Sequence, residues 1–204
     1  GEGFTLHKGE MDFNDRCGVC KDKAGMLITM LRAAGFESYP AMTMAGSRID
    51  RIPADQFNHS VTVVKLHSGE YKLLDPTWVP FVREEWSSRE QQQNYLMGLP
   101  QGADLLETPI SAPENHYFRI NGKSNLTNDG TLTGEFTLTA EGQSDASVRG
   151  IFTRNYKADW QASFERELMK ISPRIEILEM SYTDPYQYQI QPVQIKVKYK
   201  IPNY

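Results

Sequence analysis

The strongest helical pattern of the chain is carried by CGVCKDKAGMLITMLRAAG, residues 17–35. The apolar residues that follow Cys20 recur at the i, i+3, i+4, i+7 spacing of one helix face. They are Ala24, Leu27, Ile28, Leu31 and Ala34. Gly35 follows as a typical C-terminal stop. The pattern predicts a helix over residues 20–34 with Cys20 in its first turn, where backbone N–H groups have no intrahelical acceptor.

A cysteine in the first turn of a helix is a candidate nucleophile. The positive end of the helix dipole and the nearby amide donors favour thiolate over thiol, and therefore lower the pKa of the cysteine. Lys21 and Lys23 add positive charge, which Asp22 partly offsets. A thiolate that attacks an amide also needs a base that can protonate the leaving amine, and the base needs an acceptor that orients it.

His59 and Asp75 are the residues that the chain offers for these two roles. Residues 59–66 and 70–75 predict two strands joined by a short glycine-containing turn. If the last residue of the first strand pairs with the first residue of the second, Asp75 is a diagonal neighbour of His59 on one sheet face, about 7–8 Å away. Their side chains can then form a hydrogen bond. A turn one residue longer would send them to opposite faces.

Three blocks of sequence, in this order, resemble the transglutaminase-like (transglutaminase core) superfamily. The first is the Gly-Val-Cys, helix, Leu-Arg-Ala-x-Gly pattern around Cys20, the second is Gln56-Phe-Asn-His-Ser-Val, and the third is Leu74-Asp-Pro-Thr-Trp. Three motifs in order are far more specific than one alone. Cys-Lys-Asp-Lys and Phe-Asn-His more narrowly resemble bacterial multidomain members, as found in Bacteroidetes. The resemblance covers residues 12–78.

The resemblance implies an α+β fold of the papain-like, transglutaminase-core cysteine hydrolase type, in which the helix with Cys20 packs on an antiparallel sheet that carries His59 and Asp75. It implies that Cys20 attacks an amide or ester carbonyl, that His59 shuttles the proton and that Asp75 orients His59. The backbone N–H of Cys20 is the natural first oxyanion donor. Asn58 and Trp78, which adjoin the motifs, are expected to line the cleft.

The leading hypothesis is therefore acyl transfer on amide bonds of proteins or peptides by a Cys-His-Asp triad. Hydrolysis, as by a protease or amidase, is favoured over cross-linking, because the bacterial members that the chain resembles are often proteases or amidases. The same resemblance implies an extracytoplasmic setting, periplasmic or at the cell surface of a bacterium. The competing hypothesis is a non-catalytic binding or scaffold module of a larger envelope protein.

Cys17 and Cys20 support a third hypothesis, because they form the Cys-x-x-Cys motif of thiol-disulfide redox proteins. A thioredoxin-like fold would also need a strand that leads directly into the motif, whereas residues 9–16 are polar and typical of a turn. A milder version keeps the transglutaminase-like fold and makes Cys17 a redox partner, whose reversible disulfide with Cys20 switches the nucleophile off.

The composition of the chain limits which other partners and cofactors can be expected. Twenty-two Lys and Arg against 26 Asp and Glu give a net charge of −4, and neither sign dominates enough to predict a nucleic-acid partner. No run approaches the ~18–20 consecutive apolar residues of a membrane span. Two cysteines and a distant histidine give no spaced set of metal ligands, so neither a metal nor another cofactor is expected. The oligomeric state stays open.

The chain is expected to divide near Pro113. Residues 1–113 form the expected transglutaminase-like catalytic core, and residues 114–204 a smaller, incomplete α+β or β-rich accessory unit of a longer protein. The other elements predicted are a strand over 37–44, a polar loop over 45–55, a helix over 84–95, a hairpin of 116–127 and 131–141, a helical region over 144–171, and strands over 175–182 and 191–201.

Overall fold

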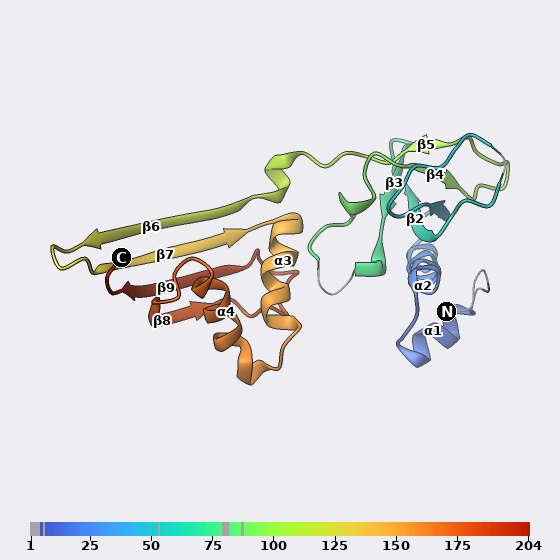
Figure 1. The fold of residues 1–204 in the computed structure, drawn as a ribbon. Coiled ribbons are helices and arrows are strands. Elements are labelled where there is room, and N and C mark those ends of the chain that lie inside the picture. The colour runs from blue at the N-terminus through green and yellow to red at the C-terminus, as the bar shows by residue number, and fades with distance from the viewer. Residues whose placement is uncertain (1–4, 6, 53, 79–81, 87) are drawn as a thin grey trace. The chain divides into compact units, whose positions relative to one another are not determined.

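A computed structural model describes residues 5, 7–52, 54–78, 82–86 and 88–204 (Figure 1). The described chain has an α+β fold with two antiparallel sheets, one of five strands and one of four. It divides into two compact units, Gly1–Val79 with Glu84–Ser111, and Pro80–Arg83 with Ala112–Tyr204. No helix among the described residues is both long and apolar enough to cross a membrane.

The first unit contains two helices and a sheet with strand order β3-β2-β1-β4-β5. Its elements are α1 Gly9–Asp15, α2 Cys20–Ala33, β1 Ser38–Thr43, β2 His59–Lys65, β3 Tyr71–Leu74, β4 Asn94–Met97 and β5 Leu106–Glu107, with 3-10 turns at Pro76–Trp78 and Ser88–Glu90. Figure 1 shows α2 beside the sheet and α1 beside α2. The helix predicted over 20–34 is confirmed, as are the strands predicted over 37–44, 59–66 and 70–75.

Alternation along the strands gives the first sheet two different faces. On one face, α2 is held by hydrogen bonds from Thr62 Oγ1 to the Ala24 carbonyl at 3.2 Å and from Ser38 Oγ to the Ile28 carbonyl at 3.3 Å. The opposite face carries the apolar core of this unit. Its buried members are Ala41, Val61, Val63, Leu73, Tyr95 and Met97, and Trp86 packs against them. Trp86, from the chain between β3 and β4, therefore helps to cover the face that α2 leaves open.

The helix predicted over residues 84–95 is wrong. The structure has only the 3-10 turn Ser88–Glu90 there, followed by β4. Thr108 explains the difference, because its hydroxyl donates to the Glu90 carbonyl at 2.6 Å and accepts from the Gln93 N–H at 2.9 Å. These backbone groups thus bond to a distant residue instead of to a helical turn.

Residues 9–16, expected to be turn-like, instead contain the short helix α1. Glu10 and Asp12 lie in its first turn, where their negative charges interact favourably with the positive end of the helix dipole. Arg16 ends the helix in a left-handed conformation, with φ of 50°. The connection to α2 is therefore a tight corner between two helices.

The second unit is a sheet with strand order β6-β7-β9-β8 and two helices. Its elements are β6 Phe118–Leu126, β7 Leu132–Ala140, α3 Gly142–Thr153, α4 Trp160–Met169, β8 Glu176–Tyr182 and β9 Gln194–Ile201, with 3-10 turns at Pro113–His116 and Lys157–Asp159. The predicted hairpin and both C-terminal strands are confirmed. The predicted helical region is divided into α3 and α4 by the second of these turns.

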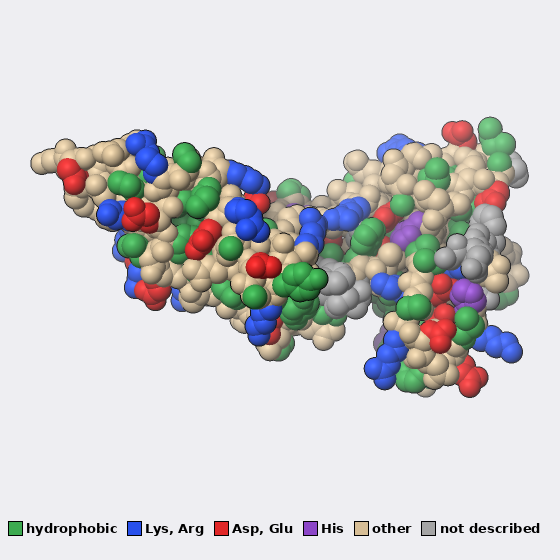
Figure 2. Space-filling model, turned by 60° about the horizontal axis from the view of Figure 1, so that its bottom comes forward, with side chains coloured by type: hydrophobic (Ala, Val, Ile, Leu, Met, Phe, Trp, Pro, Cys, Tyr) green, Lys and Arg blue, Asp and Glu red, His purple; other side chains and the backbone are tan. Residues whose placement is uncertain are grey.

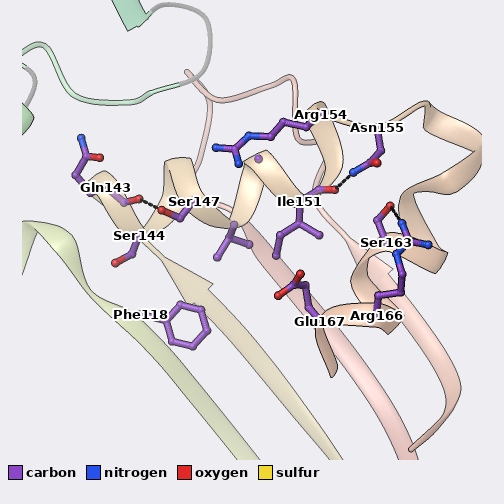
Figure 3. Close-up of a pocket in the computed structure, with 12 residues that line it drawn as sticks. Phe118, Gln143, Ser144, Ser147, Ile151, Arg154, Asn155, Ser163, Arg166 and Glu167 are labelled. Carbon is purple, nitrogen blue, oxygen red and sulfur yellow. Dashed lines mark hydrogen bonds between the residues drawn. The ribbon is translucent and has the colours of Figure 1, made fainter. Parts of the chain in front are cut away.

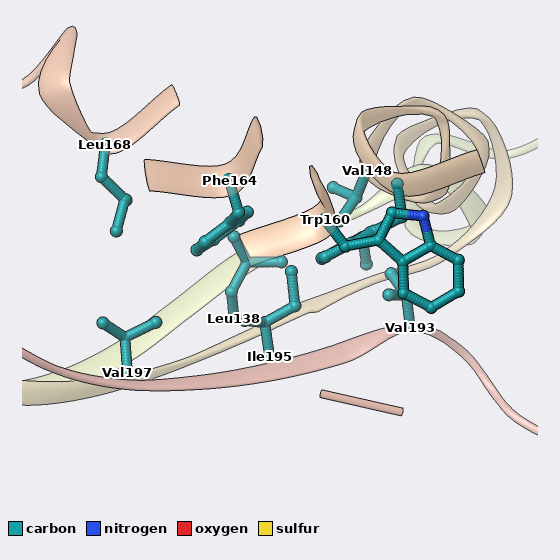
Figure 4. Packing of buried hydrophobic residues seen from close by; sticks show 10 residues of the cluster. Leu138, Val148, Trp160, Phe164, Leu168, Val193, Ile195 and Val197 are labelled. Atoms are coloured by element: carbon teal, nitrogen blue, oxygen red, sulfur yellow. The ribbon is translucent and has the colours of Figure 1, made fainter. Parts of the chain in front are cut away.

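The core of the second unit lies between its helices and its sheet (Figure 4). Its buried residues are Leu138, Ala140, Val148, Phe152, Trp160, Phe164, Leu168, Val193, Ile195 and Val197. Arg83 belongs to this unit as well, because its guanidinium bonds to Glu141 Oε1 at 2.7 Å and to the Tyr188 carbonyl at 2.5 Å. Positive and negative side chains are interspersed over the face of the molecule that Figure 2 shows.

A buried ion pair joins α3 to the chain that precedes β9. Arg149 Nε lies 2.6 Å from Asp145 Oδ2, and the two side chains are 1% and 0% exposed. Arg149 also donates to the carbonyls of Pro185 and Gln191, and the other Asp145 oxygen accepts from the Val193 N–H. Three of these four bonds are buried and the one to Gln191 is partly buried, so the network lies largely in the interior, where an unpaired charge is expensive.

Candidate functional site

Cys20 is the first residue of α2, and the turn before it contains the close contact that the Gly-Val-Cys motif requires. A Cβ added at Gly18 would lie 2.6 Å from Asp22 Cβ, so a larger residue does not fit there. The Val19 N–H donates to Asp22 Oδ2 at 3.0 Å, which satisfies a backbone donor at the helix start. Cys20 is partly buried and Cys17 is exposed, and both thiols are free.

Two further contacts fix the position of this helix start. The second oxygen of the buried Asp22, Oδ1, lies 3.1 Å from His7 Nδ1. Lys23 Nζ donates to the Thr77 carbonyl at 2.8 Å, in the turn that follows Asp75. The start of α2 is therefore tied both to the N-terminal segment and to the aspartate of the candidate triad.

His59 and Asp75 are in contact, because the hairpin has the shorter of the two turn lengths considered in the sequence analysis. Thr62 pairs with Leu74 and Lys65 with Tyr71, which is the register in which Asp75 is a diagonal neighbour of His59. His59 Nε2 lies 3.1 Å from Asp75 Oδ2, and the side chains are 7% and 0% exposed. Asp75 Oδ1 accepts from the Thr77 N–H at 2.9 Å, so both carboxylate oxygens are held.

Cys20 and His59 line the same cavity, and their side chains influence each other's pKa. The interaction with His59 is the main cause that lowers the pKa of Cys20 from its ordinary 9.0, against the opposing effect of burial, and backbone hydrogen bonds at Ser60 and Lys21 act in the same direction. Burial also opposes the charged form of His59, but the hydrogen bond to Asp75 and the interaction with Cys20 raise the pKa of His59 to about 10. The site thus favours a thiolate next to an imidazolium.

The two nitrogens of the imidazole have separate tasks. Since Nε2 faces Asp75, Nδ1 is the nitrogen left for the thiol. Burial raises the pKa of Asp75, but hydrogen bonds from His59 and Thr77 outweigh it and keep that pKa below the ordinary value. A carboxylate that stays ionised beside an imidazole orients the ring and stabilises its positive charge.

Glu90 is a third ionisable group of the site, and the sequence analysis missed it. It is 2% exposed, and one of its oxygens, Oε2, has no hydrogen-bond partner among the described residues. Ligand atoms of His59, Asp75 and Glu90 all lie within 4.8 Å of one another. Burial, followed by the charge of Asp75, raises the pKa of Glu90. No local motif marks Glu90, because tertiary packing alone brings it to the triad.

A cavity of about 420 Å³ opens beside Cys20 and His59. Asn58, expected to line the cleft, is among its lining residues. Trp78, for which the same was expected, is not among them; Arg89 lies over its ring at 4.9 Å from the ring centroid. The cavity therefore adjoins Asn58 and the two residues expected to react.

The second unit has a cavity of about 630 Å³ along α3 and α4, shown in Figure 3. Its lining includes the hydroxyls of Ser144 and Ser147, but these donate to the backbone carbonyls of His116 and Gln143. Ser163 Oγ accepts from Arg166 Nη2 at 2.8 Å. These hydroxyls are bonded to groups that cannot act as a base for them, so the candidate site is the one in the first unit.

Among the described residues, two side-chain clusters have ligand atoms spaced as a metal ion requires: His59, Asp75 and Glu90, and His7, Asp12 and Asp22. In each cluster the histidine already lies 3.1 Å from an aspartate oxygen. Hydrogen bonding between these side chains is thus sufficient to account for both arrangements.

Comparisons with protein-family models, with curated proteins and with solved structures found no match.

Proposed function

We propose that the first unit is a transglutaminase-like cysteine acyltransferase or hydrolase of papain-like fold that acts on amide bonds of proteins or peptides. The observation that carries the proposal is the position of His59, whose Nε2 lies 3.1 Å from Asp75 Oδ2 and which lines one cavity with Cys20. Nucleophile, base and orienting carboxylate in mutual contact are the recurring requirements of covalent acyl transfer.

The chemistry follows from these contacts. The Cys20 thiolate attacks the carbonyl carbon of the amide, and the backbone N–H of Cys20 at the helix start is placed to stabilise the oxyanion. His59 gives its proton to the leaving nitrogen as the C–N bond breaks, which leaves a thioester on Cys20. Water then attacks the thioester, His59 accepts the proton of that water, and the acid product leaves as the thiolate is restored.

Hydrolysis is the favoured outcome of this proposal, and the resemblance to bacterial multidomain members supports it. The extracytoplasmic setting belongs to the same proposal, on the same resemblance. Transfer to an amine instead of water would depend on how well the site excludes water from the thioester.

The proposal is tested by the rate at which iodoacetamide alkylates each cysteine at neutral pH, followed by mass spectrometry. Cys20 is expected to react at least about tenfold faster than Cys17, although Cys17 is the more exposed, because the thiolate is the reactive form. His59→Ala is expected to slow the reaction of Cys20 and to leave that of Cys17 unchanged.

Cys17→Ala serves as the matched control, because it removes the other thiol and keeps the triad. This variant should retain the fast reaction in full. Equal and slow alkylation of both cysteines would contradict the proposal and favour a non-catalytic module. Loss of the fast reaction in Cys17→Ala would instead favour a redox pair.

A further inference from the structure

The cavity beside Cys20 is lined by both polar and apolar residues. The polar ones are Cys20, Lys21, Asn58, His59 and Ser60. The apolar ones are Pro40, Met42, Phe57, Leu96 and Met97, and Gly98 completes the lining. A site that combines an apolar pocket with a few polar groups is the usual form of a small-molecule or side-chain pocket, and about 420 Å³ lies within the common size range of about 300–1,000 Å³.

The strand register places three of the lining residues side by side. Met42 pairs with Ser60 on one side and with Leu96 on the other, so the three side chains form a row across β2, β1 and β4. Met42 is an even number of residues from Ser38, whose side chain bonds to α2, so the row lies on the α2 face of the sheet. The row thus extends sideways from the start of α2, where Cys20 lies.

One wall of the cavity is held in place by its own hydrogen bonds. Asn58 Oδ1 accepts from the Ala45 N–H at 2.7 Å, and Asn58 Nδ2 donates to the Ala45 carbonyl at 3.2 Å. Gln56 bonds in the same way to the backbone of Asp50 and Ile52. The loop that carries Phe57 is therefore preorganised, and the Asn58 amide is already used within the protein.

We propose that this cavity binds an apolar side chain, such as that of Leu, Met or Phe, on the acyl part of a peptide substrate, at or next to the residue whose carbonyl Cys20 attacks. The proposal rests on the proposed function and adds the substrate class. A carboxamide side chain such as that of Gln would lose its water among Pro40, Met42 and Leu96, with only two methylene groups to gain from burial. A main-chain amide beside an apolar residue is therefore the preferred target over a glutamine side chain.

The test uses peptide chloromethyl ketones, in which the thiolate forms a bond to the methylene carbon and chloride leaves. Two acetylated dipeptide series vary one residue, Leu, Phe, Gln, Glu or Lys, either at the position that supplies the ketone or at the preceding one, with Ala at the other. Leu and Phe are expected to label Cys20 at least roughly tenfold faster than Gln or Glu in one of the series.

Met42→Gln is the informative variant, because it replaces the central apolar side chain by a polar one of similar length. It is expected to reduce the ratio of Leu to Gln labelling roughly 3- to 10-fold. Met30→Gln is the matched control, since Met30 lies on the same unit but is 61% exposed on α2, outside the cavity. Leu96→Asn, with the exposed Leu106→Asn as its control, repeats the test if Met42→Gln does not fold.

Iodoacetamide separates the two ways in which this test can fail. If Cys20 reacts fast with iodoacetamide, in a manner that needs His59, but all side chains label alike in both series, the proposed substrate class is wrong and the proposed function stands. If Cys20 is no more reactive than Cys17 toward any reagent, the proposed function itself fails. An unchanged Leu to Gln ratio in both cavity variants would also overturn the assignment of the cavity.

Discussion

Glu90 and Asp75 are two buried carboxyl groups whose oxygens lie within 4.8 Å of each other at a single imidazole. Only Asp75 has both oxygens hydrogen-bonded, since Oε2 of Glu90 has no partner in the described part of the chain. Their environments shift the two pKa values apart, down for Asp75 and up for Glu90. One carboxyl is thereby set to stay charged and the other to take up a proton first.

Glu90→Gln is predicted to lower the pKa of His59. The negative charge of ionised Glu90 is one of the causes that raise this pKa to about 10. Below the raised pKa of Glu90 itself, the parent and the variant are both neutral at this position, so their His59 resonances should agree at acidic pH and diverge above it. NMR titration of the imidazole measures the shift. Glu107→Gln, at an exposed glutamate of the same unit, should leave the titration unchanged, and an unaltered His59 pKa in Glu90→Gln would contradict the prediction.

Asp75→Asn is predicted to reduce the fraction of Cys20 that is present as thiolate at neutral pH. Removal of this charge lowers the pKa of His59, so His59 is positively charged over a narrower pH range. The Cys20 thiolate then loses part of the stabilisation that this charge provides, and the pKa of Cys20 rises. The midpoint of Cys20 alkylation should move to higher pH, and any hydrolytic activity should fall roughly 100-fold or more. The fold should remain, because the new side chain still offers an oxygen to the Thr77 N–H. Asp50→Asn, at an exposed residue, is the control; an unshifted alkylation midpoint in Asp75→Asn would mean that Asp75 does not tune the pair.

The sequence was sufficient to predict the part of the site that depends on local patterns. Helix periodicity places Cys20 at a helix start, whereas the hairpin brings His59 to Asp75 only with the shorter of two turn lengths, and the structure shows that this is the one adopted. Both are short-range features, in which spacing along the chain determines position in space.

The parts that sequence analysis missed depend on contacts between distant residues. Glu90 reaches the triad because Thr108, which is remote in sequence, holds its backbone in a 3-10 turn instead of the predicted helix. The row of Ser60, Met42 and Leu96 in the cavity combines β2, β1 and β4, and the position of β4 beside β1 had no signal in the sequence. Pairing between strands that are far apart in the chain is set by the whole fold, not by local periodicity.

Gly18→Ala is predicted to displace the start of α2, because the new Cβ would lie 2.6 Å from Asp22 Cβ. Overpacking of this kind typically costs about 1–3 kcal/mol. The displacement also moves the Cys20 thiol from His59, so alkylation of Cys20 should slow. Gly25→Ala is the matched control in the same helix: nothing lies within 4 Å of its added Cβ, and helix propensity should stabilise the unit by about 0.5–1 kcal/mol. Thermal unfolding and alkylation rates measure both effects, and an equal response of the two variants would contradict the prediction.

Arg149→Ala is predicted to destabilise the second unit by about 3–5 kcal/mol, because it leaves the Asp145 carboxylate buried without its partner. Hydrogen exchange of the β7 and β9 amides is the suitable measurement, because a chain of two compact units need not unfold in one step. Lys198→Ala, which breaks an exposed pair with Glu179 in the same sheet, should leave this exchange almost unchanged.

A combined Asp145→Leu and Arg149→Met variant separates charge burial from hydrogen bonding. It removes the uncompensated charge, so part of the stability lost in Arg149→Ala should return. Recovery should remain incomplete, because the Val193 N–H and the Pro185 and Gln191 carbonyls lose their partners. If Arg149→Ala changed exchange no more than Lys198→Ala does, α3 would be held to the chain before β9 by apolar packing alone.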